Sequence, residues 1–169
     1  MNALVIRLPP ILLVAIVLHT AVSPNLRFFG VAIDLLLLLS IAAGVAGGPE
    51  RGAIVGFTCG LLADCFLQTP FGLSALTYAL VGYGVGVFQT GVLHSSWWIP
   101  AITAAVASVV AVVIFVTLGL VVGQAQLLST HLLEVAGVLA LLHALFAPPV
   151  VRLARWAVAD GNAPGLVLR

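Results

Sequence analysis

The pattern of apolar and polar positions divides this chain into six long apolar stretches. A helix that crosses a membrane needs about 20 consecutive, mainly apolar residues. Six stretches reach or approach this length, and polar or turn-forming residues separate them. They cover approximately residues 4–22, 27–46, 52–68, 73–92, 99–122 and 127–147. The pattern therefore predicts an all-α, polytopic transmembrane helical bundle of six helices.

The residues between the stretches indicate where the helices end. Ser23-Pro24-Asn25 and Gly47-Gly48-Pro49 are turn compositions, and Pro148-Pro149 is expected to stop or kink the sixth helix. Residues 1–158 are predicted to form a single transmembrane domain. Residues 159–169 contain Gly, Asn and Pro and are expected to form a short, flexible cytoplasmic tail.

Composition excludes the soluble alternatives. The chain has 169 residues, of which 63% are hydrophobic and only 7% are charged, whereas soluble domains have about 25% charged residues. There is no basic face for a nucleic acid. The first stretch could be mistaken for a signal peptide, but no convincing A-x-A cleavage site follows it, so it is expected to remain as the first span.

The arginines predict the orientation. With six spans both termini lie on one side, together with Arg7, Arg51, Arg152, Arg155 and Arg169; the opposite side has only Arg27. Loops that stay in the cytoplasm carry an excess of positive residues. The chain is therefore expected to be a multi-pass protein of the cytoplasmic (inner) membrane with both termini in the cytoplasm.

The stretch between Gly52 and Gly72 is the most distinctive part of the chain. Gly52, Gly56 and Gly60 recur every four residues, Asp64 takes the next such position, and Pro70 and Gly72 close the segment. A face of small residues lets helix backbones approach closely. These glycines are therefore expected to serve helix packing, either within the chain or against a partner.

Ionisable residues within the spans gather in the half of the bundle away from the arginines. Hairpin geometry puts Asp34 and Asp64 at similar depth there, and His131 and Glu134 also fall in this half. Carboxylates inside a membrane are costly and should face protein or water. Three readings stay open for the two aspartates: a path for protons or substrate, a polar clamp between helices, or a surface for a partner.

Other chemistry has no signature in the sequence. His19, His131 and His143 are too scattered for a metal site, and Cys59 and Cys65 point to different sides of one helix. There is no phosphate-binding loop, nucleophile elbow or HExxH motif. The sequence predicts no enzymatic activity, no cofactor and no metal.

One family resemblance emerges from three motifs. The pattern GFxxGLLxDxxxxxPxGLxAL begins at Gly56, Asp34-Leu-Leu-Leu precedes it, and Leu80-Val-Gly-Tyr-Gly follows it. Together they resemble the rod shape-determining protein MreD family. The resemblance covers about residues 27–90 by motif and the whole chain by length and hydropathy. The matching positions are Asp34, Gly56, Gly60, Asp64, Pro70 and Gly72.

The resemblance implies a non-enzymatic scaffold of the bacterial cell-elongation complex. Family members work with the bitopic membrane protein MreC and with MreB, RodA and a penicillin-binding transpeptidase in peptidoglycan synthesis and cell-shape maintenance. The family's bundle is also similar to the substrate-binding subunits of energy-coupling-factor transporters. That similarity supplies an alternative, a vitamin-type substrate-binding subunit with a pocket lined by Asp34, Asp64 and His131.

Overall fold

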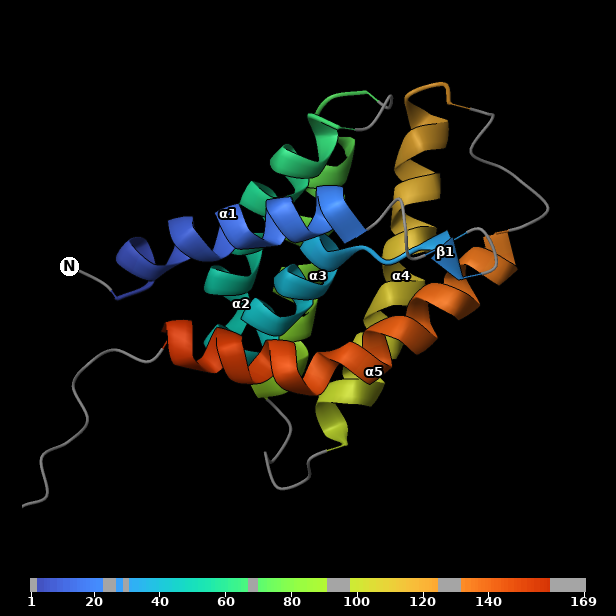
Figure 1. The fold of residues 1–169 in the computed structure, drawn as a ribbon. Coiled ribbons are helices and arrows are strands. Elements are labelled where there is room, and N and C mark those ends of the chain that lie inside the picture. The colour runs from blue at the N-terminus through green and yellow to red at the C-terminus, as the bar shows by residue number, and fades with distance from the viewer. Residues whose placement is uncertain are drawn as a thin grey trace, which may run out of the picture.

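The computed structural model describes residues 3–22, 27–28, 31–66, 70–90, 98–124 and 132–158. Within these ranges the chain forms five helices and one pair of two-residue antiparallel strands (Figure 1). In chain order the elements are α1 (Ala3–Val22), β1 (Arg27–Phe28), β2 (Val31–Ala32), α2 (Leu35–Asp64), α3 (Leu73–Thr90), α4 (Ile99–Val121) and α5 (Leu132–Val158).

Helix α2 is a tight hairpin of two helical halves, residues 35–47 and 49–64. Gly48 between them has φ 80° and ψ −174°, which is outside the helical region and disfavours a residue with a Cβ atom. A Cβ built on Gly52 would lie 2.8 Å from the Cα of Gly44. Eight residues of a straight helix rise about 12 Å, so this contact requires the chain to reverse. Pro49 then starts the second half, where its missing N–H costs nothing.

Glycines bring α3 into backbone contact with both halves of this hairpin. A Cβ built on Gly52 would lie 2.3 Å from the carbonyl oxygen of Gly82, and one on Gly44 would lie 2.5 Å from the same oxygen. Further along, Gly56 meets the backbone of Tyr78 and Gly60 meets that of Ala75. Side chains at these positions would separate the helices, which is why small residues dominate such contacts.

The first half of α2 lies at the centre of the molecule. Every residue from Leu36 to Val45 is buried, and α2 packs against α1, α3, α4 and α5. A helix that is apolar on all sides is covered either by lipid or by neighbouring helices, and here neighbouring helices cover it. The leucine run therefore becomes the core around which the other helices are arranged.

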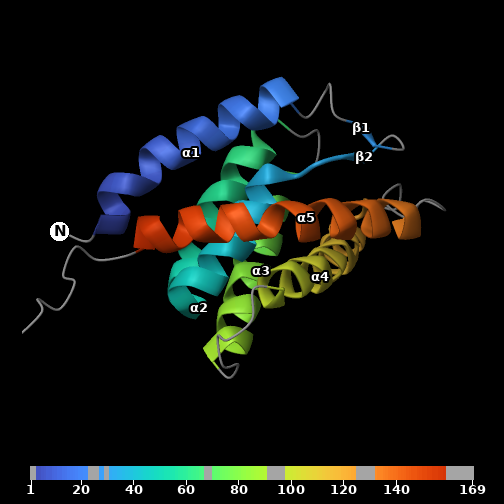
Figure 2. The same cartoon turned by 60° about the horizontal axis from the view of Figure 1, so that its bottom comes forward.

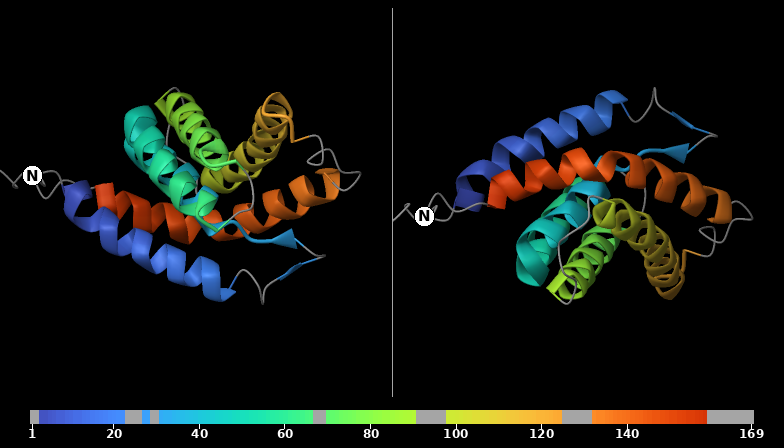
Figure 3. Two further views of the ribbon diagram at one scale, coloured as in Figure 1. Left: turned by 90° about the horizontal axis from the view of Figure 1, so that it is seen from above. Right: turned by 90° about the horizontal axis from the view of Figure 1, so that it is seen from below.

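Helices α1 and α5 lie side by side and run in opposite directions across the α2–α3 pair (Figure 2). Viewed from above and below, α3 and α4 diverge from each other on the side away from α5 (Figure 3). Two helices in the described part of the chain, α4 and α5, are long and apolar enough to cross a membrane; Arg7–Ala21 and Leu73–Gln89 are shorter apolar helices.

The structure corrects the predicted beginning of the second helix. Residues 27–46 were expected to be helical throughout, but β1 and β2 occupy the first part and the helix begins at Leu35. The Asp34 carboxylate caps it by accepting hydrogen bonds from the backbone N–H groups of Leu36 and Leu37 at 3.1 and 3.0 Å. Asp34 therefore precedes the helix instead of lying inside it, as N-cap aspartates do.

Two further boundaries differ from expectation. The segments predicted as separate second and third helices belong to one element, α2, so the described residues contain five helices instead of six. Helix α5 does not stop at Pro148-Pro149 but continues to Val158, with a bend visible in Figure 3. Each proline removes one hydrogen bond to the preceding turn, and packing on neighbouring helices retains the helix. Residues 159–169, the expected tail, lie outside the described residues.

Candidate functional site

Asp34 joins the start of α2 to α3. Besides capping α2, its carboxylate accepts a hydrogen bond from the Tyr78 hydroxyl of α3. On the next turn of α2, the Ser40 hydroxyl donates to the Tyr78 carbonyl oxygen at 2.9 Å. Tyr78 and Ser40 are buried, so these bonds form in a medium where an unpaired polar group is expensive. Asp34 therefore fixes the position of α3 against α2.

Asp64 holds the first turn of α3 in a similar way. Its carboxylate accepts hydrogen bonds from the backbone N–H groups of Gly72, Ser74 and Ala75 at 2.7, 3.0 and 3.3 Å. The first N–H groups of a helix have no partner within the helix and carry a partial positive charge. A buried carboxylate from the end of α2 supplies both the acceptors and the negative charge.

The structure brings the two carboxylates to the same end of the hairpin, within the first two turns of α3. Gly72, which has φ 99°, begins this contact, and Pro70 precedes it in the tight turn. Glu134 lies exposed in the first turn of α5. His131, the fourth residue of the predicted site, lies outside the described residues. The glycines Gly52, Gly56 and Gly60 face α3 within the chain.

A second buried polar pair joins α4 to α5. The Ser108 hydroxyl lies 2.6 Å from Nδ1 of His143 and also donates to the Ala104 carbonyl oxygen at 2.6 Å. Because the hydroxyl has one hydrogen, donation to Ala104 requires the imidazole to carry its proton on Nδ1. His143 is fully buried near Asp34.

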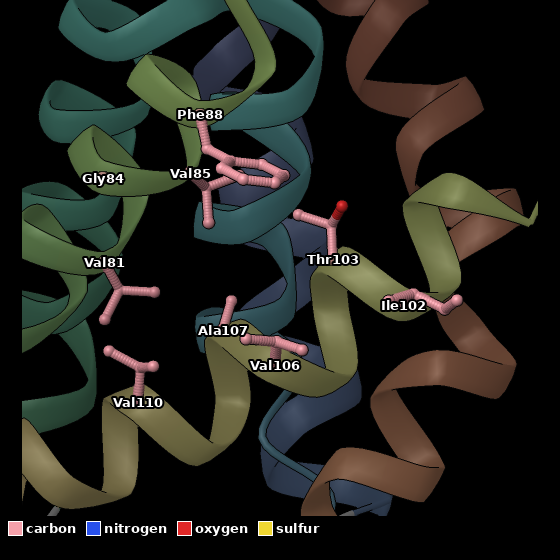
Figure 4. A pocket seen from close by; sticks show the side chains of 9 residues that line it. All are labelled: Val81, Gly84, Val85, Phe88, Ile102, Thr103, Val106, Ala107 and Val110. Atoms are coloured by element: carbon pink, nitrogen blue, oxygen red, sulfur yellow. The ribbon is translucent and has the colours of Figure 1, made fainter. Parts of the chain in front are cut away.

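A third polar contact joins α3 to α4 at the rim of an apolar groove. The Gln89 amide donates to the Thr103 hydroxyl at 3.2 Å, and both side chains are buried. The α3–α4 groove begins beside this pair and has a volume of about 260 Å³. It is lined by Val81, Gly84, Val85 and Phe88 of α3 and by Ile102, Thr103, Val106, Ala107 and Val110 of α4 (Figure 4).

Gly84 is the small residue of this groove. A Cβ built there meets no atom within 4 Å, in contrast to its neighbours Gly82 and Gly86, which contact α2. The three alternating glycines thus serve two faces of α3, one internal and one open. The open face forms a notch in which another helix or chain could come close to the α3 backbone.

This groove and the pairs Ser108–His143 and Asp34–Tyr78 were not predicted from the sequence. Phe88 and Val106 are common residues of apolar helices, so no local signal distinguishes them from lipid-facing residues. The expected pocket lined by Asp34 and Asp64 differs from the α3–α4 groove, which neither residue lines. Among the described residues, no group of three or more His, Cys, Asp or Glu side chains is placed to hold a metal ion.

Comparison with known proteins adds one finding to this geometry. A family model described as rod shape-determining protein MreD matches residues 2–156, which is nearly the whole chain. No curated protein and no solved structure matches with significance. The match covers the capped hairpin of α2, the glycine contacts with α3 and the apolar helices α4 and α5. The chain belongs to the MreD family, and it is accordingly a non-enzymatic, rod shape-determining membrane protein of cell elongation.

Proposed function

We propose that this chain serves the rod complex as a membrane scaffold that holds the transmembrane helix of a single-span partner, an MreC-like bitopic protein, in the α3–α4 groove. The groove carries this proposal. It is open to the surroundings of the bundle, lined almost entirely by apolar side chains, and contains an exposed glycine, Gly84.

A transmembrane helix is the occupant that fits these properties best. Amphipathic or apolar helices bind in grooves through side chains spaced three and four residues apart. In a membrane the hydrophobic effect does not separate helix from lipid, so association depends on close packing at small residues. Gly84 and Ala107 provide this packing from opposite walls of the groove. Through its partner the chain would support MreB, RodA and a penicillin-binding transpeptidase in peptidoglycan synthesis.

We also propose an arrangement in the membrane. Residues 1–158 would form one membrane domain with six crossings, counting the two halves of α2 separately, and residues 159–169 a cytoplasmic tail. Arg7 contacts Trp156, and Arg51 contacts Val158, so the arginines of the chain's beginning, middle and end meet at one end of the bundle. The excess of positive charge there favours the cytoplasmic side.

We propose that the chain is similar to substrate-binding subunits of energy-coupling-factor transporters only in the arrangement of six crossings, and not in binding a ligand. The two carboxylates that would line a ligand site hold hydrogen bonds to α3 instead. Asp34 and Asp64 therefore support the scaffold by fixing α3, one wall of the groove. Whether Glu134 and His131 contact the partner is a separate proposal, supported by the exposure of Glu134 at the start of α5.

The substitution Gly84→Leu tests the groove. Gly84 is exposed and an added Cβ meets no atom within 4 Å, so the free energy of unfolding should stay within about 0.5 kcal/mol, as for most surface changes. Co-purification of a tagged MreC-like partner from membranes should fall about 5- to 150-fold, because overpacking an interface costs about 1–3 kcal/mol. Cells that depend on the variant should lose rod shape.

Gly137→Leu is the matched control. Gly137 is also an exposed helical glycine whose added Cβ would meet no atom within 4 Å, but it lies on α5 away from the groove. This variant should retain the partner and the rod shape. Equal retention of the partner by Gly84→Leu and the unchanged protein would contradict the proposed docking site.

A further inference from the structure

The outer face of α5 combines an apolar stripe with exposed positive charge. Leu141, Leu145, Arg152 and Trp156 follow one another at intervals of four, seven and four residues, which puts them on one side of the helix. Leu141 is 72% exposed, Leu145 67% and Trp156 56%, and Arg152 is exposed as well. Leu141, Leu145 and Arg152 are exposed, while Arg7 of α1 contacts the last residue of the stripe, Trp156.

The positive charge at the end of the stripe exceeds the negative charge near it. Arg155 adds a second exposed guanidinium beside Arg152. The Arg7 guanidinium lies 4.7 Å from the centre of the Trp156 ring, while its Nη1 donates to the Trp156 carbonyl oxygen at 2.6 Å. Arg51, at the start of the second half of α2, donates to the Val158 carbonyl oxygen at 3.2 Å. We call this region, with Arg7, Arg51, Arg152 and Arg155, the arginine end.

Most of the described carboxylates lie away from the arginine end. Asp34 and Asp64 bind the first turns of α3, and Glu134 lies eighteen residues before Arg152 on α5. Glu50, at the bend of α2, is the remaining described carboxylate, and the guanidinium-bearing Arg152 and Arg155 are both exposed. Asp160 follows in the sequence, outside the described residues.

The length of the stripe matches one leaflet of a membrane. Eleven residues separate Leu141 from Arg152, a rise of about 16 Å along a straight helix, which the bend at Pro148-Pro149 shortens. Half of the hydrocarbon thickness of a bilayer is about 15 Å. An acyl chain along Leu141 and Leu145 would therefore bring its headgroup phosphate to the level of Arg152 and Arg155.

We infer that the outer face of α5 is a binding site for an anionic phospholipid. The phosphate is held by Arg152 and Arg155, and one acyl chain lies along Leu141 and Leu145. Trp156, with an apolar ring and a polar N–H, is suited to the same headgroup level. Guanidinium groups bind phosphate oxygens through paired N–H donors, which makes arginine effective here.

A lipid explains this surface better than an acidic protein segment does. An acidic segment would need the arginines alone, whereas the exposed leucines continue from them toward the middle of the bundle over the length of a leaflet. The face also differs from the α3–α4 groove, so the inference is independent of the proposed partner site.

Native mass spectrometry of the purified chain tests the inference. Phosphatidylglycerol and phosphatidylcholine with identical acyl chains are added in equal amounts, and the ratio of retained lipids is measured. A basic residue near an anionic membrane surface contributes about fivefold in affinity. Phosphatidylglycerol should therefore be preferred about thirtyfold, and Arg152→Gln/Arg155→Gln should reduce this preference to within about twofold of one.

Three further variants make the result specific. Arg152→Lys/Arg155→Lys retains the charge and should retain most of the preference. Arg27→Gln removes an arginine from β1, near the opposite end of α5 (Figure 1), and should change nothing. Leu141→Ala/Leu145→Ala should reduce retention of both lipids without changing their ratio.

Two outcomes would overturn the site. One is an unchanged lipid ratio in Arg152→Gln/Arg155→Gln; the other is equal retention of both lipids by the unchanged chain. If the double variant does not fold, Arg152→Gln and Arg155→Gln are measured singly, and each should reduce the preference about fivefold. Binding of an acidic peptide in place of lipid, without any lipid preference, would also exclude the inference.

Discussion

Individual polar side chains fasten the helices of this protein in pairs. Asp34 and Tyr78 join α2 to α3, Gln89 and Thr103 join α3 to α4, and Ser108 and His143 join α4 to α5. Only 7% of the residues are charged, so few strongly polar side chains are present to join the helices. Each of the three described pairs lies at a different contact between helices. These bonds favour one arrangement of helices whose apolar surfaces alone would allow several.

The Tyr78 hydroxyl provides a direct measure of one such bond. Tyr78→Phe removes the donor to Asp34 and should lower the free energy of unfolding by about 0.6–2 kcal/mol, the range for hydrogen bonds between membrane helices. Thermal or detergent-induced unfolding of the purified protein measures this. Tyr83→Phe is the control, because Tyr83 lies on the same helix but is 51% exposed; equal effects of both variants would contradict the role of the bond.

Asp64 should be more sensitive than Tyr78. Asp64→Ala leaves three N–H groups at the start of α3 without their acceptor, and each unsatisfied buried group costs about 1–3 kcal/mol. Asp64→Asn retains one acceptor oxygen but lacks the charge, so its loss of unfolding free energy should be smaller. The exposed Glu50→Gln is the control. If Asp64→Asn unfolds at the same temperature as the unchanged protein, the capping contact is not the reason for this carboxylate.

At the scale of elements, the glycine contacts between α2 and α3 are the main structural device. The carbonyl oxygen of Gly82 lies where side chains of Gly44 and Gly52 would otherwise be. Three helical segments therefore meet at backbone distance. The central segment, the first half of α2, thereby becomes fully enclosed.

Two neighbouring glycines of α3 separate internal packing from the open face. Gly82→Ala would put a Cβ 2.3 Å from the carbonyl oxygen of Gly52 and should lower the free energy of unfolding by about 1–3 kcal/mol, as overpacking does. Gly84→Ala meets no atom and should leave stability unchanged or raise it. Unfolding experiments on both variants test this; equal loss in both would show that helix flexibility, and not packing, explains these glycines.

At the scale of the whole molecule, the two cysteines report on the proposed orientation. Cys65 is exposed at the end of α2 beside Asp64, and Cys59 is buried. The arginine end is proposed to face the cytoplasm, so Cys65 should lie toward the opposite side. A maleimide that does not cross membranes should label spheroplasts of cells expressing the chain, and Cys65→Ala should abolish the labelling.

If Cys65 is labelled only after the inner membrane is opened, the chain has the opposite orientation to the one proposed. The Cys59→Ala variant should be labelled like the unchanged protein, since burial protects Cys59 from the reagent. An activity reporter fused after Arg169 should independently report a cytoplasmic C-terminus. Agreement between the two experiments would establish which side of the membrane each end of the bundle faces.

The sequence by itself determined the class of protein and several of the positions at which helices end. A composition with so few charges is compatible only with a membrane, and Gly47-Gly48-Pro49 and Pro70-Phe71-Gly72 break helices for reasons present in their own backbones. The motifs around Asp64 also sufficed to identify the family, as the match over residues 2–156 shows.

Only the tertiary structure decided what the residues contact. An N-cap and a residue inside a helix look alike in an apolar sequence, so Asp34 could not be recognised as a cap without its neighbours. Pro148 and Pro149 lie inside a helix because α5 packs along its length. The angle between helices decides which glycine of α3 faces α2 and which faces the groove. That angle cannot be derived from the pattern of residues within one helix.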